Sequence, residues 1–143
     1  ASQQANYPVT VKTGHSNVTI TLSPREILYI GGDRPAVVLG LFPEGLSKAL
    51  PQINQMTGED LLILHQDLPR PETRAQIWTL DFSAAGRWGK KQEYRALMAL
   101  AAYLRESDLY PLEAFQEAVR LNPRSAEDNL AAIEASREIK LQK

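Results

Sequence analysis

The chain has 143 residues, of which 43% are hydrophobic, and its 16 Lys and Arg residues nearly balance its 17 Asp and Glu residues. This length and composition suit one soluble domain over residues 1–143 with a single core. Because the net charge is close to zero, no overall field attracts a phosphate backbone or an anionic membrane, so we expect no nucleic-acid or membrane partner.

Cysteine does not occur in the chain, so the sequence offers no thiolate nucleophile, no disulfide and no cysteine ligand for zinc or an iron–sulfur cluster. Any electron transfer must therefore belong to another chain. The longest apolar runs are far shorter than the roughly 20 residues that span a bilayer. The first residues, ASQQAN, lack the basic start and apolar stretch of a signal peptide, so we expect a cytoplasmic protein.

The first part of the chain reads as strands. Residues 8–13 and 17–22 are rich in Val, Thr and Ile and flank residues 13–16, which include Gly, His and Ser, so they predict a hairpin or a tight connection. A short strand over residues 27–30 stops at paired glycines. Residues 36–42 are almost wholly apolar, which predicts a central strand buried on both faces.

A strand-helix-strand unit continues from that strand. Pro43 suits a helix start, and Pro51 is able to end or kink the helix. The apolar residues at helical spacing between them and beyond are Leu46, Leu50 and Ile53. Residues 60–64 form a second apolar run, and the crossover favours parallel pairing with the first. Residues 75–82 predict one more strand.

After Gly86 the apolar residues follow a helical spacing. The stripe of the longest expected helix consists of Leu97, Leu100, Ala101 and Leu104. A second helix begins near Pro111, and its apolar face consists of Leu112, Phe115, Ala118 and Val119. Ser125 and Asp128 predict a capping box before a third helix, which continues through residues 129–141. The fold class is therefore α/β, with a mixed sheet, covering helices and a helical C-terminal third.

Histidine is the commonest general base near neutral pH, and the chain has two of them. His65 follows an apolar strand and precedes Gln66 and Asp67, at the strand end where α/β sheets bind ligands. The alternative, which we favour, is that His65 caps the loop. A metal site built from His15, His65 and Asp67 would require two hairpins to meet, which the sequence does not indicate.

Basic residues gather at the start of the longest expected helix: Arg87, Lys90, Lys91 and Arg95, with Trp88 among them. Cationic side chains at a helix start suit an anion such as phosphate. Arg and Trp are also enriched at interface hot spots, so Arg87 and Trp88 would equally anchor a partner, and we favour docking over catalysis. Neither a P-loop nor a Rossmann glycine motif occurs.

The loop at residues 12–16 offers a cation, a switchable donor and a hydroxyl, from Lys12, His15 and Ser16, around the conformationally free Gly14. Such a loop suits a carboxylate or phosphate. The simpler interpretation, which we favour for the isolated segment, is a strand connection.

Several segments together resemble a known family. They are YPVTVKTGHSNVTITLS, RPAVVLGLFPEGLSKALPQI, DLLILHQ and the stretch from Ala96 to Ala135 with PLEAF, EAV and an Asn-Leu pair. The chain resembles the gamma subunit, or gamma domain, of 2-oxoacid:ferredoxin oxidoreductases, whose substrates include pyruvate, 2-ketoglutarate and ketoisovalerate. The positions that fit the family pattern are Tyr7, Lys12, Gly14, Ser23 and Ile27.

Two departures from the family pattern stand out. The family begins with a glycine-rich strand-turn-helix of the form G-x-G-G-Q-G, so we expect a family domain lacking its first strand and helix. Lys12-Thr13-Gly14 also replaces the Arg-Gly-Gly of many members, so contacts made there by the arginine do not carry over.

The resemblance implies an enzyme complex that oxidatively decarboxylates a 2-oxoacid, forms an acyl-CoA and reduces ferredoxin. Thiamine diphosphate and the iron–sulfur clusters would lie in the alpha, beta and ferredoxin-like subunits, and this chain would be an accessory part without a catalytic site or a cofactor of its own. The binding or interface residues would be Tyr7, Lys12, Gly14, His15, Ser16, Arg87 and Trp88, near coenzyme A or partner subunits. The rival hypothesis is a free-standing module that binds a small anion or nucleotide.

Overall fold

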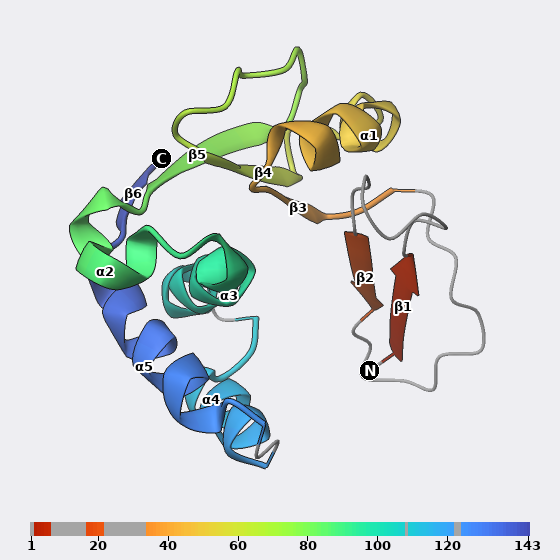
Figure 1. The fold of residues 1–143 in the computed structure, drawn as a ribbon. Helices are drawn as coiled ribbons and strands as arrows, with labels where there is room; N and C mark the ends of the chain where they lie inside the picture. Colours follow the sequence, from red (N-terminus) through yellow and green to blue (C-terminus); the bar gives the residue numbers. More distant parts are fainter. Residues whose placement is uncertain (1, 7–16, 22–33, 108, 122–123) are drawn as a thin grey trace. The chain divides into compact units, whose positions relative to one another are not determined.

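The computed structural model describes residues 2–6, 17–21, 34–107, 109–121 and 124–143 (Figure 1). The chain divides into two compact units, Ala1–Leu62 with Leu68–Gln76, and Ile63–Asp67 with Ile77–Lys143. The expectation of one domain over the whole chain stays a prediction. No helix in the described ranges has the length and apolar character needed to cross a bilayer.

The fold class is α/β with a mixed sheet, as the sequence predicts. Four strands lie in the order β3 (Val37–Gly40), β4 (Leu61–His65), β5 (Gln76–Asp81) and β6 (Lys140–Gln142). β6 pairs antiparallel with β5, with Leu141 opposite Leu80.

Backbone hydrogen bonds fix the directions of the first three strands. Leu61 donates to the carbonyl of Ala36, just before β3, so β3 and β4 begin at the same edge. Gln76 donates to Asp60, and further along Gln66 donates to Leu80, so β4 and β5 also run parallel. The predicted strand-helix-strand unit is confirmed. The prediction of a central strand over 36–42 is wrong for the described sheet, because β3 lies at one end of the order and Val37, Val38 and Leu39 are only half-buried.

In the first unit, α1 (Pro43–Ile53) connects β3 to β4 and packs on β3. Pro43 occupies its first turn, where a missing N–H costs nothing. Pro51 does not end the helix, which continues to Ile53. Leu46 and Ile53 are buried, whereas Leu50 reaches the surface.

A separate two-stranded sheet pairs β1 (Ser2–Asn6) with β2 (Asn17–Thr21) in antiparallel register. The predicted strand over 8–13, its turn at 13–16 and the strand over 27–30 lie outside the described residues. The described partner of β2 is therefore β1, a segment that was not predicted as a strand.

The second unit contains the helical part of the chain. Its longer helices are α3 (Arg95–Glu106), α4 (Leu112–Arg120) and α5 (Ala126–Ala135), and α3 packs against both others. Its core includes Ile63, Leu64, Leu80, Met98, Ala101 and Ile133, all essentially inaccessible to solvent.

Two predictions about the C-terminal helix are wrong. Ser125 has a left-handed backbone with φ 62° and makes no side-chain cap, so there is no capping box. The helix also ends at Ala135, and the chain continues through a 3₁₀ turn at Ser136–Glu138 into β6. These last residues pair with β5 as a strand. Without them, the edge of β5 would leave backbone N–H and C=O groups without hydrogen-bond partners.

Candidate functional site

The basic segment predicted as a binding surface follows β5 and folds into short turns. A 3₁₀ turn at Ser83–Ala85 leads into α2 (Gly86–Gly89), and a second 3₁₀ turn at Gln92–Tyr94 precedes α3. Gly86 has φ 57°, which glycine adopts without strain. A Cβ atom on Gly89 would overlap the carbonyl oxygen of Phe82, so only glycine allows this approach. The two glycines thus fix the path of the backbone between β5 and α3.

Trp88 is the packed centre of this segment. It is only 7% exposed, and its ring meets that of Tyr94 edge to face, with 5.1 Å between the centroids and 89° between the planes. Its contribution is therefore to pack the segment, while the neighbouring cations provide the accessible groups. The binding role predicted for Arg87 and Trp88 stays a prediction. In that role Trp88 would hold the segment together, whereas Arg87 would contact the bound molecule.

Two cations lie over the Trp88 ring. The Arg87 guanidinium carbon is 5.1 Å from the ring centroid and the Lys91 Nζ is 4.6 Å away; the same Nζ lies 5.3 Å from the Tyr94 ring. These distances suit cation–π attraction, which favours an ordered position for side chains that would otherwise be mobile. We call Arg87, Lys90 and Lys91, together with Trp88 and Tyr94, the cation–aromatic cluster.

Arg95, the fourth cation of the predicted group, has a different environment. Its guanidinium lies 6.0 Å from the ring centroid of Phe82. Burial, followed by the negative charges of Asp128 and Glu93, raises the pKa of Tyr94, so this phenol stays protonated at neutral pH. Tyr94 therefore adds no charge of its own to the three cations of the cluster.

His65 ends β4 and is enclosed. It is 7% exposed, its ring stacks on Phe82 at 5.3 Å, and its Nδ1 accepts a hydrogen bond of 3.1 Å from the backbone N–H of Asp67. Burial, and then the positive charge of Arg95, lower its pKa despite the opposing carboxylates of Asp67 and Asp81. A neutral imidazole that accepts a hydrogen bond from the loop after β4 agrees with the interpretation that His65 caps this loop. It agrees less well with a general base that faces a ligand.

The other predicted binding residues come early in the sequence. Tyr7, Lys12, Gly14, His15 and Ser16 lie outside the described residues, as do Ser23 and Ile27, so their roles stay predictions. Within the ranges that the structure does describe, no three His, Asp or Glu side chains are grouped as metal ligands.

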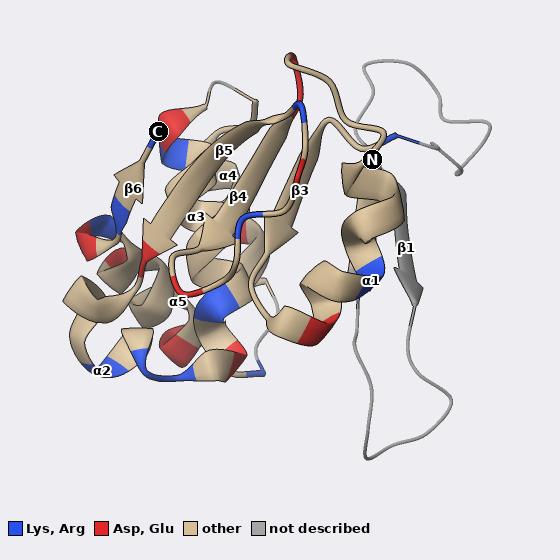
Figure 2. Cartoon of the chain, turned by 90° about the horizontal axis from the view of Figure 1, so that it is seen from above, with Lys and Arg blue, Asp and Glu red and all other residues tan. Residues whose placement is uncertain are grey.

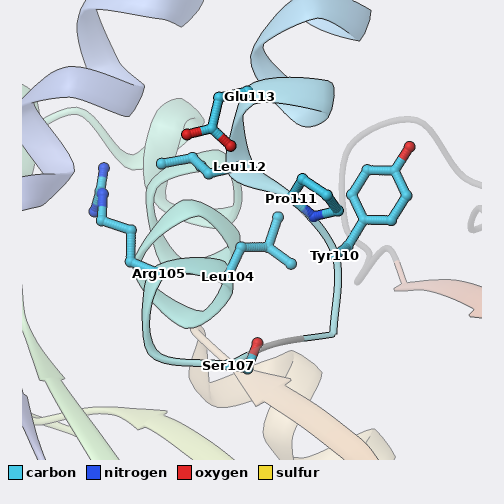
Figure 3. Close-up of a pocket in the computed structure, with 7 residues that line it drawn as sticks. All are labelled: Leu104, Arg105, Ser107, Tyr110, Pro111, Leu112 and Glu113. Atoms are coloured by element: carbon cyan, nitrogen blue, oxygen red, sulfur yellow. The ribbon is translucent and has the colours of Figure 1, made fainter.

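Sequence reasoning missed a pocket of about 410 Å³ at the junction of α3 and α4. Figure 3 shows its lining, which consists of Leu104, Arg105, Ser107, Tyr110, Pro111, Leu112 and Glu113. Arg105 donates from one Nη to the Ile133 carbonyl and to the Ser136 hydroxyl, each at 2.7 Å. Burial lowers the pKa of Arg105, and these contacts commit its guanidinium to α5 and the turn after it. The signal in the sequence was Arg105, which follows the apolar run from Leu97 to Leu104 near the end of the helix.

Large apolar side chains are exposed at both ends of α4. Leu109 is 55% exposed, Tyr110 46% and Leu121 77%. Single exposed apolar residues are ordinary on a protein surface, but here they flank a helix that has no buried residue of its own. This side of the second unit is therefore a candidate contact surface, which the sequence analysis did not single out.

Comparison with protein families gives one assignment. The family described as pyruvate ferredoxin/flavodoxin oxidoreductase matches residues 1–139, nearly the whole chain. A search of curated proteins finds no match. On the strength of the family match, the chain belongs to the pyruvate ferredoxin/flavodoxin oxidoreductase family.

Proposed function

We propose that the chain is an accessory, non-catalytic gamma-type subunit or domain of a 2-oxoacid:ferredoxin oxidoreductase complex. The observation that carries this proposal is the family match over residues 1–139. The complex would oxidatively decarboxylate a 2-oxoacid such as pyruvate to an acyl-CoA and pass the electrons to ferredoxin. This chain would contribute to assembly and to the positioning of coenzyme A.

The chemistry of the side chains supports an accessory role. Residues 1–143 contain no cysteine, so the thiolate ligands of an iron–sulfur cluster would come from elsewhere in the complex. His65, the only described histidine, has its Nδ1 occupied by the Asp67 backbone and is held neutral by burial. In the proposed complex, thiamine diphosphate and the clusters belong to the alpha, beta and ferredoxin-like subunits.

Two surfaces of the second unit support a role in assembly. One is the cation–aromatic cluster, and the other is the apolar surface around α4, with Leu109, Tyr110 and Leu121. We assign coenzyme A positioning to the loop with Lys12, Gly14, His15 and Ser16, since a lysine and a hydroxyl beside a glycine suit a phosphate. This assignment rests on the sequence alone.

The rival function is a free-standing module for a small anion or nucleotide. The observation in its favour is that Arg87, Lys90 and Lys91 form no ion pair with any described carboxylate. A module of this kind would bind coenzyme A or phosphate without other subunits, whereas an accessory subunit needs its partners to complete the site.

Co-purification tests the proposal directly. A tagged chain is expressed with the alpha, beta and ferredoxin-like subunits of the complex, and the eluate is examined by size-exclusion chromatography. We expect a stable assembly, and acyl-CoA formation that falls when the chain is left out. A chain that elutes as a monomer at high concentration with all subunits present would contradict the proposal. Calorimetry with coenzyme A and the isolated chain tests the rival function, which predicts measurable heat.

A further inference from the structure

The cation–aromatic cluster belongs to a segment whose charge differs from that of the chain as a whole. Residues 86–95 contain four basic residues and one acidic residue, whereas the complete chain has a net charge of −1. Figure 2 shows the basic residues of α2 and of the stretch that follows it along one continuous part of the chain. The rest of the chain is therefore acidic, and this segment is a local positive surface.

The three cations of the cluster reach the surface, although the negative charges of Asp128 and Glu93 lie close enough to act on Tyr94 in the same cluster. Arg87 and Lys90 are exposed and Lys91 is half-buried, and none of the three forms an ion pair with a described carboxylate. Cations on α4 and in the turn after α5 differ in this respect. Arg120 pairs with Glu117 and Arg137 with Glu134, each at 2.9 Å and each within one helical turn. Among the described residues, Arg87, Lys90 and Lys91 are thus three neighbouring cations that no ion pair engages.

The positions of these cations are partly fixed before any partner binds. Trp88 is buried, and the Arg87 and Lys91 side chains lie over its ring at 5.1 and 4.6 Å. The backbone beneath them is held by Gly86 and by the close approach of Gly89 to Phe82. Side chains that are already ordered lose less conformational entropy when they bind, so the cluster is better suited to recognition than three mobile lysines would be.

The arrangement of the cluster favours a larger acidic surface over a small anion. The pocket described in the second unit is lined by other residues, Leu104, Arg105, Ser107, Tyr110, Pro111, Leu112 and Glu113. Arg87, Lys90 and Lys91 come from consecutive turns of one surface segment, which suits a row of carboxylates on a facing protein. We propose that the cluster docks an acidic surface segment of a partner subunit. This inference rests on the proposed function and adds the chemistry of the partner surface.

A triple charge reversal, Arg87→Glu with Lys90→Glu and Lys91→Glu, tests the inference in the assembled complex. The matched control is Lys48→Glu with Arg70→Glu and Arg74→Glu, which makes the same change in net charge at three exposed positions without described ion pairs. Both proteins are first compared with the unmodified chain by circular dichroism and thermal unfolding. Their association with the other subunits is then measured by surface plasmon resonance at low and high salt.

We expect the cluster variant to associate about 10- to 100-fold more slowly at low salt, because charge complementarity acts mainly on the association rate. The difference should shrink as salt rises, since exposed charges are screened. The control should associate as the unmodified chain does. A cluster variant that associates like the unmodified chain, or a control that slows equally, would overturn the inference while leaving the proposed function in place.

Two further outcomes complete the test. If the cluster variant still assembles normally but loses heat of binding to inorganic phosphate or coenzyme A that the unmodified chain shows, the cluster is a small-anion site and the inference is wrong. If the unmodified chain does not associate with the other subunits at all, the proposed function and the inference both fail.

Discussion

Helices α3 and α4 are neighbours in the second unit, and both have an amphipathic sequence, yet they are buried to very different extents. α3 has six buried residues, which are Met98, Ala99, Ala101, Ala102, Tyr103 and Leu104. α4 has none, although its apolar and polar residues are well separated, and Leu112, Phe115 and Val119 are only half-buried. The amphipathic pattern therefore predicts which side of a helix is apolar, but not how completely that side is covered.

The difference indicates two roles for the two helices. Alanines at three of the buried positions of α3 allow close packing, and α5 contributes Ala132 and Ile133 to the same core. α4 lies at the edge of this core with exposed Leu109, Tyr110 and Leu121 around it. We interpret α3 as the stabilising element of the unit and the surface around α4 as an assembly surface, and substitutions in the two helices test this division.

The largest expected effect is that of Met98→Ala in α3. Met98 is fully buried, and removing its side chain leaves a cavity in the core, so we expect a loss of about 2–5 kcal/mol in the free energy of unfolding. Urea denaturation followed by circular dichroism measures the change. Met98→Leu, which conserves volume, is the control and should cost less than about 1.5 kcal/mol. A loss of under 1 kcal/mol for Met98→Ala would show that the α3 core is loosely packed.

A smaller effect is expected for Arg105→Gln, which removes the link from α3 to the end of α5. The guanidinium donates to the Ile133 carbonyl and the Ser136 hydroxyl, and both are in a buried region. Loss of charged hydrogen bonds of this kind costs about 1–3 kcal/mol. Arg124→Gln, at an exposed position, should leave the urea midpoint unchanged. Equal midpoints for the two variants would mean that Arg105 is not a structural link.

Phe115→Ala in α4 should cost less than the substitution in α3. Because Phe115 is half-buried, only part of its apolar surface is removed from water on folding, and we expect a loss of roughly 1–2 kcal/mol. Thermal unfolding compares it with Met98→Ala under the same conditions. If Phe115→Ala proved the more damaging of the two, the contrast between the helices would have to be reversed.

The smallest effect on stability is expected for Leu121→Ser. Leu121 is 77% exposed, so its replacement should change the free energy of unfolding by no more than about 0.5 kcal/mol. Association with the other subunits should weaken nonetheless, since the exposed leucine would be covered in the assembly. Affinity measured by titration with the purified partners checks this. Unchanged affinity would remove Leu121 from the assembly surface.

The elements with strong local signals could be predicted from the sequence. The apolar run at 60–64 is observed as β4 at Leu61–His65, and the run at 75–82 as β5 at Gln76–Asp81. Pro43 marks the start of α1 as expected. In each case the local pattern and the tertiary structure agree, so propensity alone leads to the right element.

Features that depend on distant residues could not be predicted. Ile139 and Leu141 alternate with the polar residues Lys140 and Gln142, but this short period-two signal follows a helical run rich in Ala and Glu, and only the edge of β5 makes it a strand. The buried side of α3 also differs from the predicted stripe, because Leu97 and Leu100 are half-buried while Met98 and Ala99 are fully buried, and α3 packs against α5. Packing against another helix decided which side is covered.

The candidate site shows the same limit. Its residue types, Arg87 and Trp88 beside lysines, are visible in the sequence, but the burial of Trp88 is not. That burial depends on the turns at 83–94 and on the approach of Gly89 to Phe82, which follow from three-dimensional packing. Lys12 and His15 lie outside the described residues, so the sequence pattern alone remains the basis for their predicted role.

The central claim is that this chain acts through assembly with catalytic subunits. Reconstitution of the oxidoreductase from separately purified subunits, with and without this chain, measures it most directly through 2-oxoacid-dependent reduction of ferredoxin and formation of acyl-CoA. We predict that the chain joins the complex in a fixed ratio and raises the rate of acyl-CoA formation, while showing no such activity alone. A complex that forms and turns over equally well without the chain would contradict the account.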